Sequence, residues 1–142
     1  MKERLFENIT LDELDNVCNY IKEELNGAKT AVILLTGGMG AGKTTFTSRL
    51  INLFGNEEYV NSPTFNIWNV YEPDDYRFYH FDLYRLEDEN EIYDMGFDEI
   101  WGVEGISIIE WWQRAADIIP SEHIEVLFET VSEDSRTIRV IS

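Results

Sequence analysis

The stretch 37–44 reads Gly37-Gly38-Met39-Gly40-Ala41-Gly42-Lys43-Thr44 and fits the pattern G-x-x-x-x-G-K-[ST] of the phosphate-binding P-loop. The apolar run 31–35 leads directly into it, and apolar residues recur at helical spacing from Phe46 to Phe54. A P-loop needs this context, because its backbone N–H groups surround a phosphate between a buried strand and a helix N-terminus. A chance glycine-rich turn would lack these neighbours. The sequence therefore predicts a nucleotide-binding protein.

The rest of the chain alternates between predicted helices and strands. We expect strands over residues 5–9, 31–36, 64–71, 77–84, 106–110, 123–130 and 136–141, and helices over 10–26, 43–54, 87–95 and 111–118. Gly27, Gly55 and Gly96 are expected to end the first three helices, and 64–84 and 123–141 to form hairpins. The strands at 31–36 and 106–110 are so apolar that they should be parallel and covered on both faces. The predicted fold class is α/β: a single P-loop NTPase-like domain over residues 1–142, with a mixed central sheet flanked by helices.

Composition excludes several classes of function. Eleven Lys and Arg residues against 28 Asp and Glu give a net charge of −17, which repels a nucleic-acid backbone. The segment Met1 to Leu5 has no apolar signal core, and no stretch approaches the ~20 apolar residues of a membrane span. The one cysteine, Cys18, falls on an apolar helix face, which favours core packing over a disulfide or metal site. We expect a cytoplasmic protein without membrane contact.

The P-loop predicts where metal-binding carboxylates are needed. Lys43 is expected to neutralise the β and γ phosphates, and the Thr44 hydroxyl to hold Mg²⁺, which leaves the metal in need of carboxylates at nearby strand ends. Glu110 directly follows an apolar strand, at the sheet edge where α/β proteins bind nucleotides. We interpret Glu110 as a functional carboxylate rather than a solvated strand end.

Asp82 and Thr64 are further candidates, each with a structural alternative. Asp82 interrupts an apolar run that would not tolerate an unpaired charge, so it either binds Mg²⁺ or water, or pairs with Arg85 or His80. Thr64 follows the P-loop helix, where it either senses the γ-phosphate or caps a strand. His80 itself is expected to be a packed or hydrogen-bonded core histidine rather than a base.

Five motifs follow one another along the chain. They are Gly40-Ala41-Gly42-Lys43-Thr44-Thr45, Ser62-Pro63-Thr64-Phe65, His80-Phe81-Asp82-Leu83-Tyr84-Arg85-Leu86, Met95-Gly96-Phe97-Asp98-Glu99 and Ile109-Glu110-Trp111. In this order they resemble the TsaE family, also called YjeE, whose members are small bacterial P-loop ATPases required for the threonylcarbamoyladenosine modification of tRNA. The resemblance implies ATP hydrolysis in a complex with TsaD and TsaB, with tRNA contacted only indirectly through these partners.

The resemblance also implies ATP and Mg²⁺ as cofactors and gives roles to individual residues. The phosphate-binding positions are Gly37, Gly38, Gly40, Ala41, Gly42, Lys43, Thr44 and Thr45, of which Thr44 matches the Mg²⁺ hydroxyl and Thr45 a second hydroxyl near the phosphates. Thr64 matches a switch-like threonine. Asp82 and Glu110 match the two acidic residues used around Mg²⁺ and the attacking water, and their separate roles stay open.

Other classes of P-loop protein carry sequence features that this chain does not show. A small-molecule kinase should carry an arginine-bearing lid, whereas the seven arginines here are scattered. A GTPase needs an N-K-x-D motif to read guanine, and none of the four lysines belongs to one. A non-hydrolysing scaffold that ATP switches between partner-binding states stays an alternative, which multiple-turnover phosphate release would separate from an ATPase.

The charge balance predicts that the isolated protein binds tRNA weakly, because −17 of net charge opposes the phosphate backbone. Fluorescence polarisation with labelled tRNA should show binding only when partner proteins are added. Tight, salt-sensitive binding by the protein alone would contradict this expectation.

Overall fold

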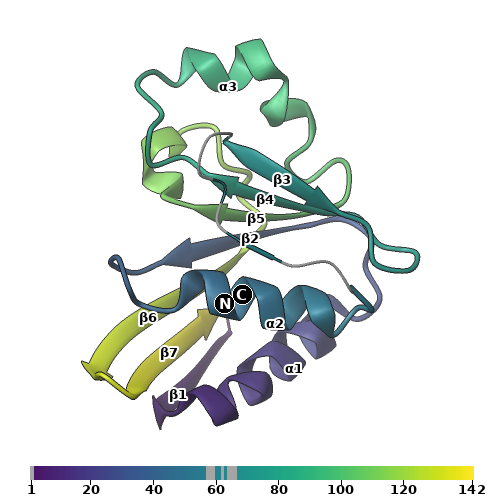
Figure 1. Ribbon diagram of the computed structural model, residues 1–142. Helices are drawn as coiled ribbons and strands as arrows, with labels where there is room; N and C mark the ends of the chain where they lie inside the picture. Colours follow the sequence, from purple (N-terminus) through teal and green to yellow (C-terminus); the bar gives the residue numbers. More distant parts are fainter. Residues whose placement is uncertain (1, 57–59, 62, 64–66) are drawn as a thin grey trace.

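The computed structural model describes residues 2–56, 60–61, 63 and 67–142. Seven strands in this part of the chain form one mixed sheet, in the order β1-β7-β6-β2-β5-β4-β3 (Figure 1). The strands are β1 (Glu3–Ile9), β2 (Ala31–Thr36), β3 (Trp68–Tyr71), β4 (Phe78–Asp82), β5 (Ile106–Glu110), β6 (Ile124–Ser132) and β7 (Ser135–Ile141). Helices α1 (Leu14–Leu25), α2 (Lys43–Asn52) and α3 (Asn90–Met95) and the 3-10 turns η1 (Leu11–Glu13), η2 (Phe97–Glu99) and η3 (Trp112–Ala115) connect them.

Parallel strands occupy the centre of the sheet, as the apolar runs predicted. β2 pairs in parallel with β5 on one side and β6 on the other, and β4 pairs in parallel with β5. The expected hairpins are confirmed as the antiparallel pairs β3–β4 and β6–β7, and β1 closes the other edge by pairing with β7. The register sets Leu35 and Asp82 on either side of Glu110, so β2, β5 and β4 end at the same edge.

Helices cover both faces of the sheet, which explains the unbroken apolar run of β2. Ile33 and Leu35 pack in the core beneath α1 and α2, whereas Val32 and Leu34 face the core covered by α3 and η2 (Figure 1). Cys18 is fully buried on α1, its Sγ 3.8 Å from the Phe46 carbonyl oxygen, and burial raises the pKa of this thiol to about 12. The expected packing role of Cys18 is confirmed. None of the described helices has the length and apolar character that crossing a membrane requires.

Several helix ends differ from those predicted. The expected capping box forms, with Glu13 Oε1 accepting the Thr10 backbone N–H at 3.1 Å, but it opens the 3-10 turn η1 before α1 begins. Asn26, not Gly27, is the left-handed C-cap of α1. Helix α2 ends at Asn52, because the chain tightens into a turn before Gly55, so Gly55 is not its C-cap.

The predicted helix over 111–118 is wrong. Trp111 has a φ of 57°, in the left-handed region that a right-handed helix cannot contain, and the chain continues as the short 3-10 turn η3. The apolar spacing of this segment reflects packing of Trp112 and Ala115 rather than a helix face. The turn immediately follows Glu110 and directs the Trp111 ring toward Lys43.

The backbone of Trp111 generates a stability prediction. Trp111→Gly and Trp111→Ala both remove the indole, but alanine retains a Cβ that a left-handed backbone disfavours. We expect the glycine variant to be more stable than the alanine variant by about 1 kcal/mol, the reverse of the usual order. Urea unfolding of both variants measures this difference. Equal stability, or a more stable alanine variant, would show that the turn rearranges once the ring is lost.

Candidate functional site

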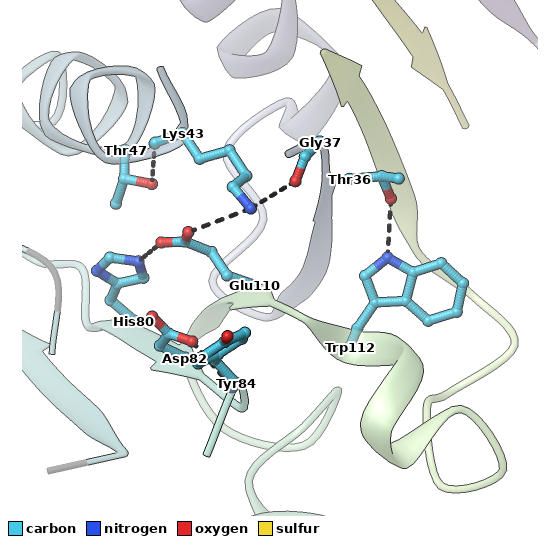
Figure 2. Close-up of polar contacts among 9 residues, drawn as sticks. All are labelled: Thr36, Gly37, Lys43, Thr47, His80, Asp82, Tyr84, Glu110 and Trp112. Atoms are coloured by element: carbon cyan, nitrogen blue, oxygen red, sulfur yellow. Dashed lines mark hydrogen bonds and ion pairs between the residues drawn. The ribbon is translucent and has the colours of Figure 1, made fainter. Parts of the chain in front are cut away.

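Three neighbouring strand ends and one loop meet at the candidate site. The P-loop leaves β2 after Thr36, while β5 ends at Glu110 and β4 at Asp82. The parallel register pairs Asp82 with Glu110 directly. Figure 2 shows Lys43, from the start of α2, extending toward Gly37 and Glu110. The structure thus brings together the P-loop and both carboxylates that the sequence singled out.

The glycines of the P-loop have distinct geometric roles. Gly40 and Gly42 have φ values of 78° and 98°, which a residue with a side chain rarely adopts. Gly37 is needed for a different reason, since a Cβ there would lie 3.0 Å from Phe128 Cβ. Gly42 caps α2, and its carbonyl accepts the Phe46 N–H at 2.9 Å. The loop therefore delivers the chain to the N-terminus of α2, where backbone N–H groups are available to an anion.

Lys43 is buried, with a relative exposure of 7%. Its Nζ donates to the Gly37 carbonyl oxygen at 2.7 Å and lies 3.9 Å from Glu110 Oε1 (Figure 2). The ammonium also lies 4.6 Å from the centre of the Trp111 ring, within the range of a cation–π interaction. These contacts stabilise a buried charge that would otherwise be costly.

Glu110 is held by His80, a contact that sequence reasoning missed. The His80 Nε2 lies 2.5 Å from Glu110 Oε2, and both side chains are buried. Because a carboxylate oxygen accepts hydrogen bonds, Nε2 carries the proton and donates it. His80 is thus the expected hydrogen-bonded core histidine, and its partner is Glu110. Alternation along β4 places His80 and Asp82 on one face, a signal that pointed to this arrangement.

Asp82 is less constrained than Glu110. It is half-buried, and its Oδ1 accepts the backbone N–H of Tyr84 at 3.0 Å. Burial raises the pKa of Asp82, and the nearby Glu110 acts in the same direction, while the Tyr84 hydrogen bond opposes both. The side chain is therefore a carboxylate with increased basicity at a strand end.

A second set of hydrogen bonds, which sequence reasoning also missed, lies beside the P-loop. Thr36 Oγ1 accepts the indole N–H of Trp112 at 2.9 Å (Figure 2). The same hydroxyl donates to Glu125 Oε2 at 3.0 Å. Trp112 thereby ties the turn after Glu110 to the end of β2. No sequence pattern predicts these hydrogen bonds, because the partners of Thr36 lie 76 and 89 residues away in the chain.

The remaining predicted residues fall in different places. Thr44 follows Lys43 on α2 and is half-buried, whereas Thr45 is exposed and lines a cavity beside the loop. Thr64 lies outside the described residues, so its switch role stays a prediction.

The cavity beside the P-loop has a volume of about 450 Å³. Its lining comes from residues 9–12, Leu14, the loop residues 40–42, Thr45, and the β6–β7 hairpin. Apolar side chains of Ile9, Leu14 and Phe128 lie in it together with Asp12, Asp134 and Arg136. Both ends of the chain therefore form a pocket next to the phosphate loop.

Comparison with known proteins gives consistent matches. The family model described as "Threonylcarbamoyl adenosine biosynthesis protein TsaE" matches residues 10–138. The chain is 38% identical over 107 residues to the tRNA threonylcarbamoyladenosine biosynthesis protein TsaE of Bacillus subtilis, over 75% of this chain and 66% of that protein. The protein of the same name from Haemophilus influenzae is 34% identical over 119 residues, 84% of this chain and 75% of the relative. The chain thus spans slightly less than two thirds of the first of these relatives.

A solved structure agrees with these matches. The crystal structure of Bacillus subtilis YdiB superimposes with a TM-score of 0.77 and 26% sequence identity, covering 98% of this chain and 84% of that chain. The family model covers the P-loop, Asp82 and Glu110 within its matched range. On these matches, the chain belongs to the TsaE family.

Proposed function

We propose that this protein binds ATP with Mg²⁺ at the P-loop and hydrolyses it, as the ATPase of the machinery that makes threonylcarbamoyladenosine in tRNA. One observation carries the proposal: the buried Lys43 ammonium lies between the P-loop carbonyl of Gly37 and the strand-end carboxylate of Glu110. A cation in this position is suited to bridging phosphate oxygens, with carboxylates beside it.

Phosphate binding would use groups that the P-loop already presents. The backbone N–H groups at the start of α2 favour negative charge, and the positive end of the helix dipole adds to them. Lys43 would exchange its hydrogen bond with Gly37 for one with a phosphate oxygen, which is a stronger, charge-assisted bond.

The residues at the site fit Mg²⁺. The described residues hold no cluster of three or more His, Cys, Asp or Glu side chains that would bind a metal alone. Nucleotide-bound Mg²⁺ does not need one, because it uses one or two carboxylates together with phosphate oxygens and water. Asp82, Glu110 and the Thr44 hydroxyl are hard oxygen donors of this kind. When bound, the ion would neutralise charge on the transferred phosphoryl group.

The two carboxylates differ in a way that suits different tasks. Glu110 has one oxygen fixed by His80 and the other directed toward Lys43, so its orientation is set before a ligand arrives. Asp82 is less fixed, and its pKa is raised by burial, which makes it a better proton acceptor for a water molecule. We propose that Glu110 holds Lys43 in place at the phosphate end of the site and that Asp82 positions the attacking water.

The cavity beside the loop has the size and lining to hold the nucleoside of ATP. Its volume of about 450 Å³ falls within the range of small-molecule sites, and it combines apolar walls with a few polar groups. Because Gly40, Gly42 and Thr45 line it, a base and ribose placed there would adjoin phosphates held by the loop.

The proposed pathway and partners are inferred from the family to which the chain belongs. Relatives are named as tRNA threonylcarbamoyladenosine biosynthesis proteins, and five motifs of this chain resemble that family. We therefore propose TsaD and TsaB as partners in the cytoplasm, with tRNA held by them. The acidic charge of −17 supports a role that does not hold tRNA directly.

Lys43→Ala should abolish productive nucleotide binding while the fold survives, because the phosphate charge loses its buried counter-charge. Calorimetric titration with Mg-ATP measures the affinity, and phosphate release with and without a TsaD–TsaB complex measures turnover. Lys29→Ala is the matched control, since Lys29 precedes the opposite end of β2. Parent-like Mg-ATP binding by Lys43→Ala would refute the site. Tight binding by the parent without multiple-turnover phosphate release would favour the nucleotide-switched scaffold.

Glu110→Gln and Asp82→Asn should each lower hydrolysis more than nucleotide affinity. Both variants keep the shape of the side chain and remove the charge that organises metal and water. If either carboxylate positions the attacking water, its single-turnover rate should fall about 100-fold or more, the scale of preorganised catalytic groups.

Glu104→Gln is the matched control, because Glu104 is exposed and precedes the start of β5, whereas Glu110 ends that strand. Rates are measured in the partner complex, with ATP affinity and melting temperature on the same variants. Near-parental rates for both substitutions would remove both carboxylates from the catalytic set, and a lowered melting temperature alone would mark a structural role.

A further inference from the structure

Arg136 connects the C-terminal hairpin to the P-loop through main-chain carbonyls. Its Nε donates to the Ala41 carbonyl oxygen at 3.1 Å, and one Nη donates to the Gly40 carbonyl oxygen at 3.0 Å. The other Nη donates to the carbonyl oxygens of Ser132 at 2.7 Å and Ser135 at 2.9 Å. One planar guanidinium thus holds two successive carbonyls of the loop and the turn between β6 and β7.

The two loop contacts fix peptide groups that matter for phosphate binding. The carbonyl of Ala41 and the N–H of Gly42 belong to the same planar peptide, so a donor that holds the carbonyl also sets the direction of the N–H. Gly42 is the N-cap of α2 and has a left-handed φ of 98°. Glycine adopts many conformations in a free loop, which means that something must restrict it here.

No carboxylate of the described residues forms an ion pair with Arg136. Among the described residues, every ion pair involves another cation, so the guanidinium is shared between carbonyl oxygens. Its positive charge therefore lies beside the P-loop carbonyls and favours an anion at the loop. A purely local role in the hairpin would not require the two contacts that cross 95 and 96 residues of sequence.

We propose that Arg136 is a positioning residue that holds the Gly40 and Ala41 peptides in the conformation that binds phosphate. The proposal rests on the proposed function, because it concerns the same loop. Arginine is required rather than lysine, since two carbonyls are held at once by donors in a fixed fork.

The test compares the parent chain with Arg136→Gln, Arg136→Lys and the control Arg139→Gln. Arg139 lies on the same strand, is half-exposed, and pairs with Glu3 at the sheet edge. Mg-ADP and inorganic tripolyphosphate are titrated by calorimetry, and hydrogen exchange is followed at the amides of residues 40–43. We expect Arg136→Gln to bind both ligands at least about tenfold more weakly and to exchange these amides faster without ligand, while α1 amides keep their rates.

The outcomes separate this inference from the proposed function. If the parent binds neither ligand, the nucleotide site fails, whereas unchanged affinity and exchange in Arg136→Gln overturn the role of Arg136 alone. A lower melting temperature with unchanged affinity also overturns it. If Arg136→Gln does not fold, Arg136→Lys decides: weakened tripolyphosphate binding with a native spectrum supports the proposal, and parent-like binding and exchange refute it.

Discussion

The buried ammonium of Lys43 is the group on which the rest of the site depends. An isolated charge at this depth would be strongly unfavourable, so the surrounding segments stabilise it: the P-loop through the Gly37 carbonyl, β5 through Glu110, and the following turn through the Trp111 ring. Glu110 is buried as well and requires His80 in addition to Lys43. Buried ion pairs contribute little net stability and are costly to break. The arrangement therefore specifies geometry more than it stabilises the fold.

The parallel sheet explains why these groups meet at all. Residues 35, 82 and 110 are far apart in sequence, yet the register of β2, β5 and β4 brings their strand ends to one edge. Helices on both faces make this possible, because the central strands are buried on each side and their polar groups appear where the strands end. The polar groups of the site thus gather at and near this edge, while most of the sheet interior is apolar apart from His80 and Ser107.

Local sequence patterns predicted much of this arrangement, but they did not predict the long-range contacts. The P-loop, β2, the two hairpins and Glu110 at a strand end follow from spacing and apolar runs. The helix expected over 111–118 was wrong, because Trp111 has a left-handed backbone that periodicity does not report. The bond between His80 and Glu110 depends on the β4–β5 register. The loop contacts of Arg136 join segments that no sequence motif links.

The pairing of β1 with β7 has a consequence for synthesis on the ribosome. Residues 3–9 are synthesised well before their strand partner, residues 136–141. Contacts of such long sequence separation form late, because the intervening chain must be ordered first. The nascent chain would hence carry residues 3–9 unpaired until residues 136–141 have been synthesised, and the cavity beside the P-loop could be complete only after that point. A chain cut off before the β6–β7 hairpin would contain the whole P-loop sequence but would lack that wall of the cavity beside it.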